Sequence, residues 1–192
     1  STNRSPEQAT AGGVGESGSF KIELSLVVDV GLVGLPNAGK SSLLNSFTNA
    51  TSAVGAYEFT TLVPHLGDLY GFTLVDIPGL IEGAAQGKGL GHRFLRHVEK
   101  TKMILHLVSL EHDDPWSVYS MVRKELSDFK KSLEDKEEWI IFTKKDLISS
   151  SEIKNRIKTI DTNENRVFII STKTGEGVKE LRDALIGKLR QD

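Results

Sequence analysis

The sequence predicts an α/β fold in which a mostly parallel six-stranded sheet carries helices on both faces. Short apolar runs with strand character alternate with longer amphipathic segments along most of the chain. The 192 residues are enough for one domain with its own hydrophobic core. This alternation implies right-handed crossovers between parallel strands, and ligands then bind at the carboxyl ends of the strands.

The composition excludes several classes of protein. The chain has 24 Lys and Arg residues against 26 Asp and Glu residues, and this balance gives no support to a basic nucleic-acid-binding domain. Cysteine is absent, which excludes disulfides, cysteine nucleophiles and cysteine-ligated zinc and fits a reducing compartment. No apolar run approaches the roughly 18 residues of a membrane span, and no signal peptide is visible. We therefore expect no membrane span.

Residues 1–21 differ in composition from the rest of the chain. Gly, Ser and Thr dominate, and Phe20 is the one large hydrophobe, so this segment cannot offset the entropy cost of ordering. We expect a linker or the remnant of a preceding domain here, followed by one globular domain over residues 22–192.

Three strands and two helices are expected in the first half of the chain. Residues 26–33 form a valine-rich run, and residues 41–49 carry hydrophobes at helical spacing. Residues 62–70 and 72–76 flank Gly71 as a hairpin, with Pro64 restricted to a sheet edge or a strand start. Residues 89–101 place their hydrophobes on one helical face.

Three further strands and three helices are expected in the second half. Residues 103–108, 139–142 and 167–170 are short, largely apolar strands. Residues 115–133 form a long amphipathic helix, with Pro115 in its first turn and Asp113 or Asp114 as its cap. Residues 152–160 and 178–189 are the remaining helices.

A phosphate-binding loop follows the first strand. The pattern G-x-x-x-x-G-K-[ST] is matched, between a strand and a helix, by Gly34-Leu35-Pro36-Asn37-Ala38-Gly39-Lys40-Ser41. The glycines let successive N–H groups face one concavity, where the helix dipole adds positive potential. Lys40 would reach the β- and γ-phosphates, Ser41 would offer its hydroxyl to Mg²⁺, and Ser42 extends the binding loop. The pattern predicts a P-loop NTPase.

Two later segments select guanine. The run Thr143-Lys144-Lys145-Asp146 follows an apolar strand and resembles the N/T-K-x-D motif of GTPases, with Leu147 after it. The carboxylate of Asp146 can accept hydrogen bonds from guanine N1–H and the N2 amine, whereas adenine lacks this donor pair. The Lys144 stem can cover the base. The last strand ends in Ser171-Thr172-Lys173, which resembles a loop that contacts guanine O6 through backbone N–H groups. Together these segments favour GTP over ATP.

Two segments between these motifs would sense the γ-phosphate. The run Asp76-Ile77-Pro78-Gly79 fits D-x-x-G at a strand end, so Asp76 would hold Mg²⁺ through water and the Gly79 N–H would contact the γ-phosphate. Phe59, Thr60 and Thr61 precede the hairpin, and we expect Thr61 to coordinate Mg²⁺. The predicted metal ligands are therefore Ser41, Thr61 and Asp76, and the predicted catalytic set is Lys40, Thr61 and Gly79.

The chain resembles the Obg family of GTPases over about residues 22–190. The resemblance rests on residues 34–41, 57–64 and 94–97, and above all on the long glycine-rich segment over 76–91. It implies a monomeric GTP-binding G domain that follows a glycine-rich Obg domain. It also implies a role in maturation of the large ribosomal subunit, with that subunit or its rRNA as partner, and in stress or nucleotide-level signalling. The implied location is the cytoplasm, or an organellar matrix in a eukaryote.

Some positions depart from that family. Thr143 stands where the family usually has Asn, so guanine selection should survive while affinity falls. Leu80 occupies the position of the glutamine that orients water in many GTPases, and the first switch offers no arginine finger. We expect slow intrinsic turnover, raised by a partner, the ribosome or a monovalent cation. Asn37 matches a loop asparagine that binds K⁺ in related GTPases, and it is equally well explained as a turn residue.

Two other functions remain open from the sequence. The first is a ribosome- or RNA-binding module in which nucleotide is structural and turnover negligible, and Leu80 keeps this alternative open. The second is a P-loop ATPase, which Asp146 disfavours.

Overall fold

The computed structural model describes residues 12–13, 15, 17–19, 28–48, 53–54, 65–76, 101–129, 133, 135–157 and 166–191. The strands within these ranges are β1 (Val30–Val33), β2 (Ala53–Val54), β3 (His65–Leu69), β4 (Phe72–Asp76), β5 (Met103–Ser109), β6 (Glu137–Thr143) and β7 (Arg166–Ile169). The helices are α1 (Lys40–Phe47), α3 (Pro115–Phe129), α4 (Ser150–Arg156) and α5 (Val178–Leu189), with the single turn η3 (Lys145–Leu147). Apart from Thr101, the helix expected over 89–101 lies outside the described residues.

These strands form one mixed sheet in the order β2-β3-β4-β1-β5-β6-β7. Strand β1 runs parallel to β4 and β5, and β6 runs parallel to β5 and β7. Only the pairings of β3 with β4 and β2 with β3 are antiparallel among the described strands. The prediction of a mostly parallel sheet is therefore confirmed. The six expected strands are all present, and the two-residue strand β2 is an addition at one edge.

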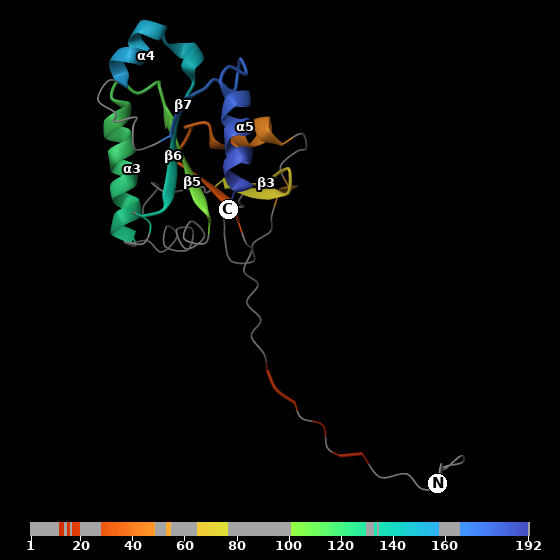
Figure 1. Ribbon diagram of the computed structural model, residues 1–192. Coiled ribbons are helices and arrows are strands. Elements are labelled where there is room, and N and C mark those ends of the chain that lie inside the picture. The colour runs from red at the N-terminus through yellow and green to blue at the C-terminus, as the bar shows by residue number, and fades with distance from the viewer. Residues whose placement is uncertain are drawn as a thin grey trace.

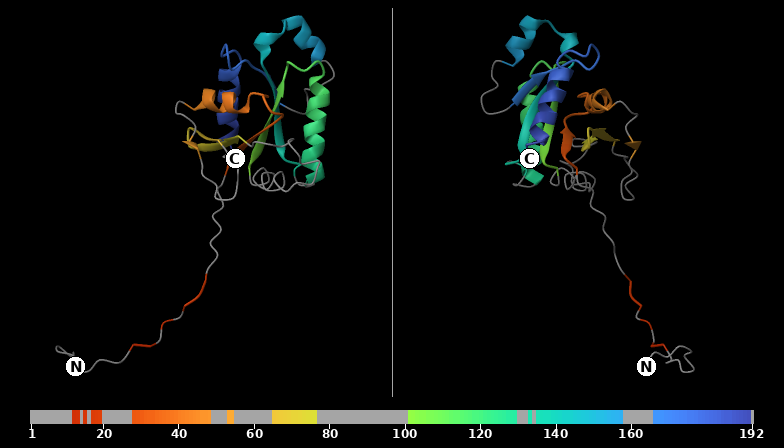
Figure 2. Two further views of the ribbon diagram at one scale, coloured as in Figure 1. Left: turned by 180° about the vertical axis from the view of Figure 1, so that it is seen from behind. Right: turned by 45° about the vertical axis from the view of Figure 1, so that its right-hand side comes forward.

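Helices cover both faces of the sheet, as the alternating sequence predicted. Helix α3 lies on one face, whereas α1 and α5 lie on the other (Figures 1 and 2). Successive residues of β5 and β6 point to opposite faces, so Leu105 and Ile141 pack with α1 and α5 while Ile104 packs with α3. Because the central strands are buried on both sides, they lack the polar alternation of a half-exposed strand.

Most element ends fall within two residues of the predictions, and the differences have local causes. Helix α4 begins at Ser150 instead of 152, because Ser149 and Glu152 form a capping box. Helix α3 ends at Phe129 instead of 133, and Asp114 caps it by accepting a 3.0 Å hydrogen bond from Ser117 N–H. The β3–β4 hairpin is confirmed, with Tyr70 and Gly71 at φ 53° and 90°.

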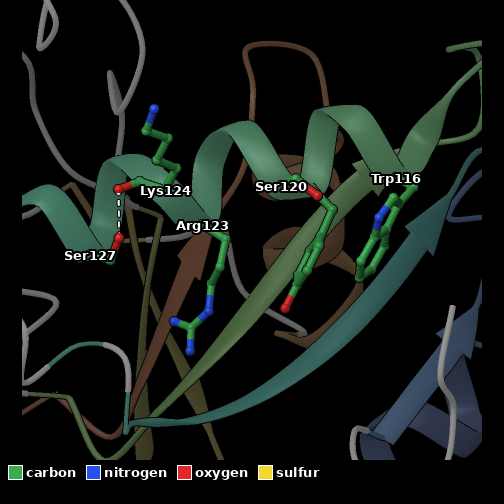
Figure 3. A pocket seen from close by; sticks show the side chains of 6 residues that line it. Trp116, Ser120, Arg123, Lys124 and Ser127 are labelled. Carbon is green, nitrogen blue, oxygen red and sulfur yellow. Dashed lines mark hydrogen bonds between the residues drawn. The ribbon is translucent and has the colours of Figure 1, made fainter.

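A buried polar cluster anchors α3 to the sheet. Glu138 of β6 accepts hydrogen bonds from His106 Nδ1 at 2.7 Å and from Tyr119 at 3.2 Å, and its carboxylate lies 3.1 Å from Arg123 Nε. Figure 3 shows Arg123 reaching from α3 toward the sheet while Lys124 points away. A shallow groove runs along this helix, and none of the sequence-predicted site residues lines it. Across the described ranges, every helix is too short or too polar to span a membrane.

Candidate nucleotide-binding site

The parallel register brings the sequence-predicted loops to one edge of the sheet. Asp76 ends β4 and pairs with Leu32, just before the phosphate loop that follows β1. Thr143 ends β6, and Phe142 pairs with Ile169 of β7, just before Ser171. Four segments that are far apart in sequence therefore meet at the carboxyl ends of their strands, where this fold class binds ligands.

Glycine is required at the start of the phosphate loop. Gly34 has φ 145°, and a Cβ there would lie 2.3 Å from the carbonyl oxygen of Leu107. At the other end, Gly39 has φ 95° and precedes the first turn of α1. Among the described residues no side chain caps this helix, so its first N–H groups remain available to an anion. Within the loop, Pro36 and Asn37 are exposed, and Asn37 has φ 62°.

The Lys40 side chain folds back over the same loop. Its Nζ donates hydrogen bonds to the carbonyl oxygens of Gly34 and Leu35, at 3.0 and 3.1 Å. Burial lowers the pKa of the Lys40 ammonium, and the Asp76 carboxylate partly opposes this effect. A buried cation beside uncapped helix N–H groups is an environment that favours a phosphate.

Two of the three residues predicted to hold the metal, Ser41 and Asp76, are adjacent. Ser41 Oγ donates a hydrogen bond to Asp76 Oδ2. Asp76 is 4% exposed, and its Oδ1 has no hydrogen-bond partner among the described residues. A hydroxyl and an orphaned carboxylate oxygen are hard donors of the kind Mg²⁺ prefers, so these residues fit the predicted ion. Thr61, the third expected ligand, lies outside the described residues.

The phosphate loop and the segment after β6 are joined directly. Buried Thr143 donates a 2.7 Å hydrogen bond from Oγ1 to the carbonyl oxygen of Ala38. Thr143 therefore links the two segments at the position where the related family usually has asparagine. The base-reading segment, residues 143–147, is therefore anchored to the loop that would hold the phosphates.

Asp146 is preorganised beside the last strand. Ser171 Oγ donates a 2.6 Å hydrogen bond to Asp146 Oδ1, and Lys173 Nζ lies 4.0 Å from Oδ2. The hydrogen bond from Ser171 lowers the pKa of Asp146. Among the residues described, the backbone N–H groups of Thr172 and Lys173 donate no hydrogen bond, so they are available to a carbonyl oxygen such as guanine O6.

Lys144 and Leu147 flank Asp146 on the surface. Lys144 adopts the left-handed conformation at φ 61°, and its ammonium pairs with Glu111 of the loop after β5. Leu147 is half exposed. The sequence reasoning did not identify Glu111, and no motif marks it.

The other predicted site residues lie outside the described ranges, and their expected roles stay predictions. They are Phe59, Thr60, Thr61, Ile77, Pro78, Gly79 and Leu80.

Comparison with known sequences finds similarity to GTPases. A family model described as "50S ribosome-binding GTPase" matches residues 29–144. Proteins named GTPase Obg are 47% identical in Desulfatibacillum aliphaticivorans and 43% identical in Erythrobacter litoralis. These matches cover 100% and 98% of this chain, and 59% and 55% of the relatives. The chain therefore spans little more than half the length of the curated relatives it matches. The resemblance to Obg GTPases is confirmed.

Comparison with solved structures supports the fold. The G domain of the T. maritima FeoB iron transporter is 21% identical with a TM-score of 0.57, and the match covers 83% of this chain and 97% of that domain. The cytosolic domain of L. pneumophila FeoB is 20% identical with a TM-score of 0.59, over 83% of this chain and 68% of that domain. At this identity the likeness confirms the P-loop GTPase fold alone.

Proposed function

The chain belongs to the family of 50S ribosome-binding GTPases, and from that membership we propose that it binds GTP and GDP and hydrolyses GTP. One observation carries the proposal. The Thr143–Ala38 hydrogen bond joins a phosphate loop to a segment whose carboxylate is suited to guanine. A nucleotide bound there would contact both segments at once.

The phosphate end is bound by charge and backbone geometry. The N-terminus of α1 supplies the backbone N–H groups of Gly39, Lys40, Ser41 and Ser42. The ammonium of Lys40 lies against the preceding loop. When a nucleotide arrives, Lys40 exchanges its two carbonyl acceptors for the β- and γ-phosphate oxygens. Because these are charged acceptors, the exchange strengthens the hydrogen bonds of a cation that is already desolvated.

Mg²⁺ would be held by Ser41 and by Asp76, the latter through water, with Thr61 as the third predicted ligand. The ion, when bound, neutralises charge that develops on the phosphates. The orphaned Asp76 Oδ1 supports this assignment. The Ser41 hydroxyl uses its hydrogen on Asp76 Oδ2, so the lone pairs of its oxygen would remain available to the ion.

Guanine is selected by hydrogen bonds in a fixed geometry. The free lone pairs of Asp146 accept from guanine N1–H and the N2 amine, while Ser171 holds the carboxylate in position. Adenine would leave this charge unpaired, and an unpaired charge is costly. The Thr172 and Lys173 N–H groups would meet guanine O6.

We further infer slow intrinsic turnover and regulation by a partner. Leu80 cannot orient water, so the water must be positioned by another group. The description of the family, 50S ribosome-binding GTPase, supports the large ribosomal subunit or its rRNA as that partner. Exposed Asn37, with its left-handed backbone, is the candidate ligand for K⁺.

Phosphate release over hours tests the proposal. Wild-type protein with Mg²⁺ should release phosphate from GTP and not from ATP, and Lys40→Ala should abolish release. Tight GDP binding without any turnover would instead favour a structural nucleotide. Parallel assays in KCl and NaCl at one ionic strength test the K⁺ assignment, because equal rates would exclude it.

A further inference from the structure

Glu111, in the loop between β5 and α3, contacts the base-reading segment directly. Its carboxylate pairs with the ammonium of Lys144, which lies 33 residues later in the chain. The hydrogen bond from Lys144 lowers the pKa of Glu111. Neighbouring Lys145 pairs with a different acidic residue, Glu176, in the loop between β7 and α5. The two adjacent lysines are therefore fixed by two different loops.

The backbone around Glu111 is fixed relative to Lys144. Leu110 N–H donates a 3.0 Å hydrogen bond to the carbonyl oxygen of Thr143, the residue before Lys144. Buried Ser109 donates from Oγ to the Glu111 carboxylate at 3.1 Å and accepts from the Glu111 N–H at 3.3 Å. A carboxylate oriented in this way loses little additional freedom when it pairs with a lysine.

Arg156 of α4 holds the same loop from its other side. Its Nη1 donates to the carbonyl oxygens of Leu110 and His112, at 2.9 and 2.7 Å. These carbonyls belong to the residues on either side of Glu111, so the guanidinium holds the loop on both sides of it. A continuous set of contacts thus runs from α4 through the Glu111 loop to Lys144.

We propose that Glu111 is a positioning residue for the guanine site, holding the Lys144 ammonium so that the aliphatic stem of Lys144 stays against the base. This inference rests on the proposed function, because it needs guanine nucleotide at Asp146. The ion pair draws the charged end of Lys144 toward the β5–α3 loop. Without Glu111 the lysine samples more rotamers, and ordering its stem over a bound base then costs entropy.

The dissociation rate of a fluorescent GDP analogue tests this role in wild type and Glu111→Gln. Both partners are partly exposed, so we expect a two- to fivefold faster release at low salt, on the order measured for exposed ion pairs. The difference should disappear near 1 M NaCl, because salt screens the pair. Asp183→Asn on α5 is the charge-matched control, because its carboxylate pairs with Arg182 outside the β5–α3 loop, and its release rate should equal that of wild type.

A second genetic background separates positioning from a general structural effect. Lys144→Met keeps the apolar stem and removes the ammonium, so Glu111→Gln should have no further effect in this background. The inference would be overturned if Glu111→Gln accelerated release equally in both backgrounds, or if it did not accelerate release in the wild-type background. Neither result would contradict nucleotide binding itself. Failure of wild type to bind the GDP analogue would instead overturn the proposed function, and this inference with it.

Discussion

The hydroxyl of Thr143 donates a 2.7 Å hydrogen bond to the carbonyl oxygen of Ala38, 105 residues earlier in the chain. The donor ends β6 and the acceptor lies in the phosphate loop, so one contact sets the distance between the two ends of the predicted nucleotide site. Thr143 is almost fully buried. Its side chain packs close to Gly39, where an added methyl group would lie 3.7 Å from it. A threonine therefore bridges the two segments at a position where the related family usually has asparagine.

Thr143→Val tests the bridge, because it keeps the side-chain shape and removes the hydroxyl. The Ala38 carbonyl would then lack its donor, at a cost of about 1 kcal/mol or more. We expect GDP to bind about tenfold more weakly in calorimetry, with faster dissociation. Thr143→Ser retains the hydroxyl and should stay close to wild type. Equal affinity of the valine and serine variants would show that the bridge is unimportant.

Asp146→Asn should change which base is bound. The amide loses one acceptor and its charge, so GDP affinity should fall about a hundredfold, corresponding to about 3 kcal/mol. The new NH₂ group can donate to the C2 carbonyl of xanthine, so xanthosine diphosphate should bind better to the variant than to wild type. Asp183→Asn on α5 makes the same chemical change away from the site. Unchanged GDP binding by Asp146→Asn would exclude this carboxylate from base recognition.

Gly34→Ala should be strongly destabilising. The new methyl would meet the Leu107 carbonyl oxygen at 2.3 Å with the backbone at φ 145°, so the loop or β5 must shift. We expect urea denaturation to report a loss of about 3 kcal/mol or failure to fold. Gly175→Ala is the matched control, since it has φ 81° but nothing within 4 Å and should lose only about 1 kcal/mol. Similar losses for both variants would rule out the close approach as the cause.

Stability should fall in acid through Glu138. Burial alone would raise the pKa of Glu138, but the hydrogen bond and charge of His106, with the charge of Arg123, hold it below its ordinary 4.5. A carboxyl group whose pKa is lower in the folded state stabilises the protein at pH values above its unfolded-state pKa. This stabilisation is lost as the pH falls through the folded-state pKa. Urea unfolding of Glu138→Gln should show about 3 kcal/mol less stability than wild type at pH 7. That difference should shrink below pH 4.5, and a constant difference down to pH 3 would contradict the assignment.

The fold was predictable to the extent that its signals are local. The central strand β5 is mostly apolar and buried along its whole length, and α5 begins and ends at the predicted residues 178 and 189. Strand β2 was missed because two residues carry no periodicity, so its pairing with β3 is a tertiary effect. The start of α4 was placed two residues late, although the Ser149–Glu152 spacing is itself a capping signal.

The predicted site residues that the structure describes come together because ligand chemistry requires particular residue types at fixed spacing. Examples of such residues are Gly34, Lys40 and Asp146. Glu111 could not be predicted in the same way, because its partner Lys144 is 33 residues away in the sequence. Nothing in the local sequence distinguishes Glu111 from other acidic residues on surface loops. The buried His106–Glu138 pair was missed for a related reason: a carboxylate before an apolar run is normally exposed, and its partners come from other elements.

Calorimetric titration of the wild-type chain with Mg²⁺ and GDP, repeated with ADP, tests most directly the claim that one site binds the phosphates and selects guanine. We expect GDP to bind with one nucleotide per chain and ADP to bind at least a hundredfold more weakly, since Asp146 would be left unpaired. Absence of heat with GDP, or equal affinity for GDP and ADP, would contradict it.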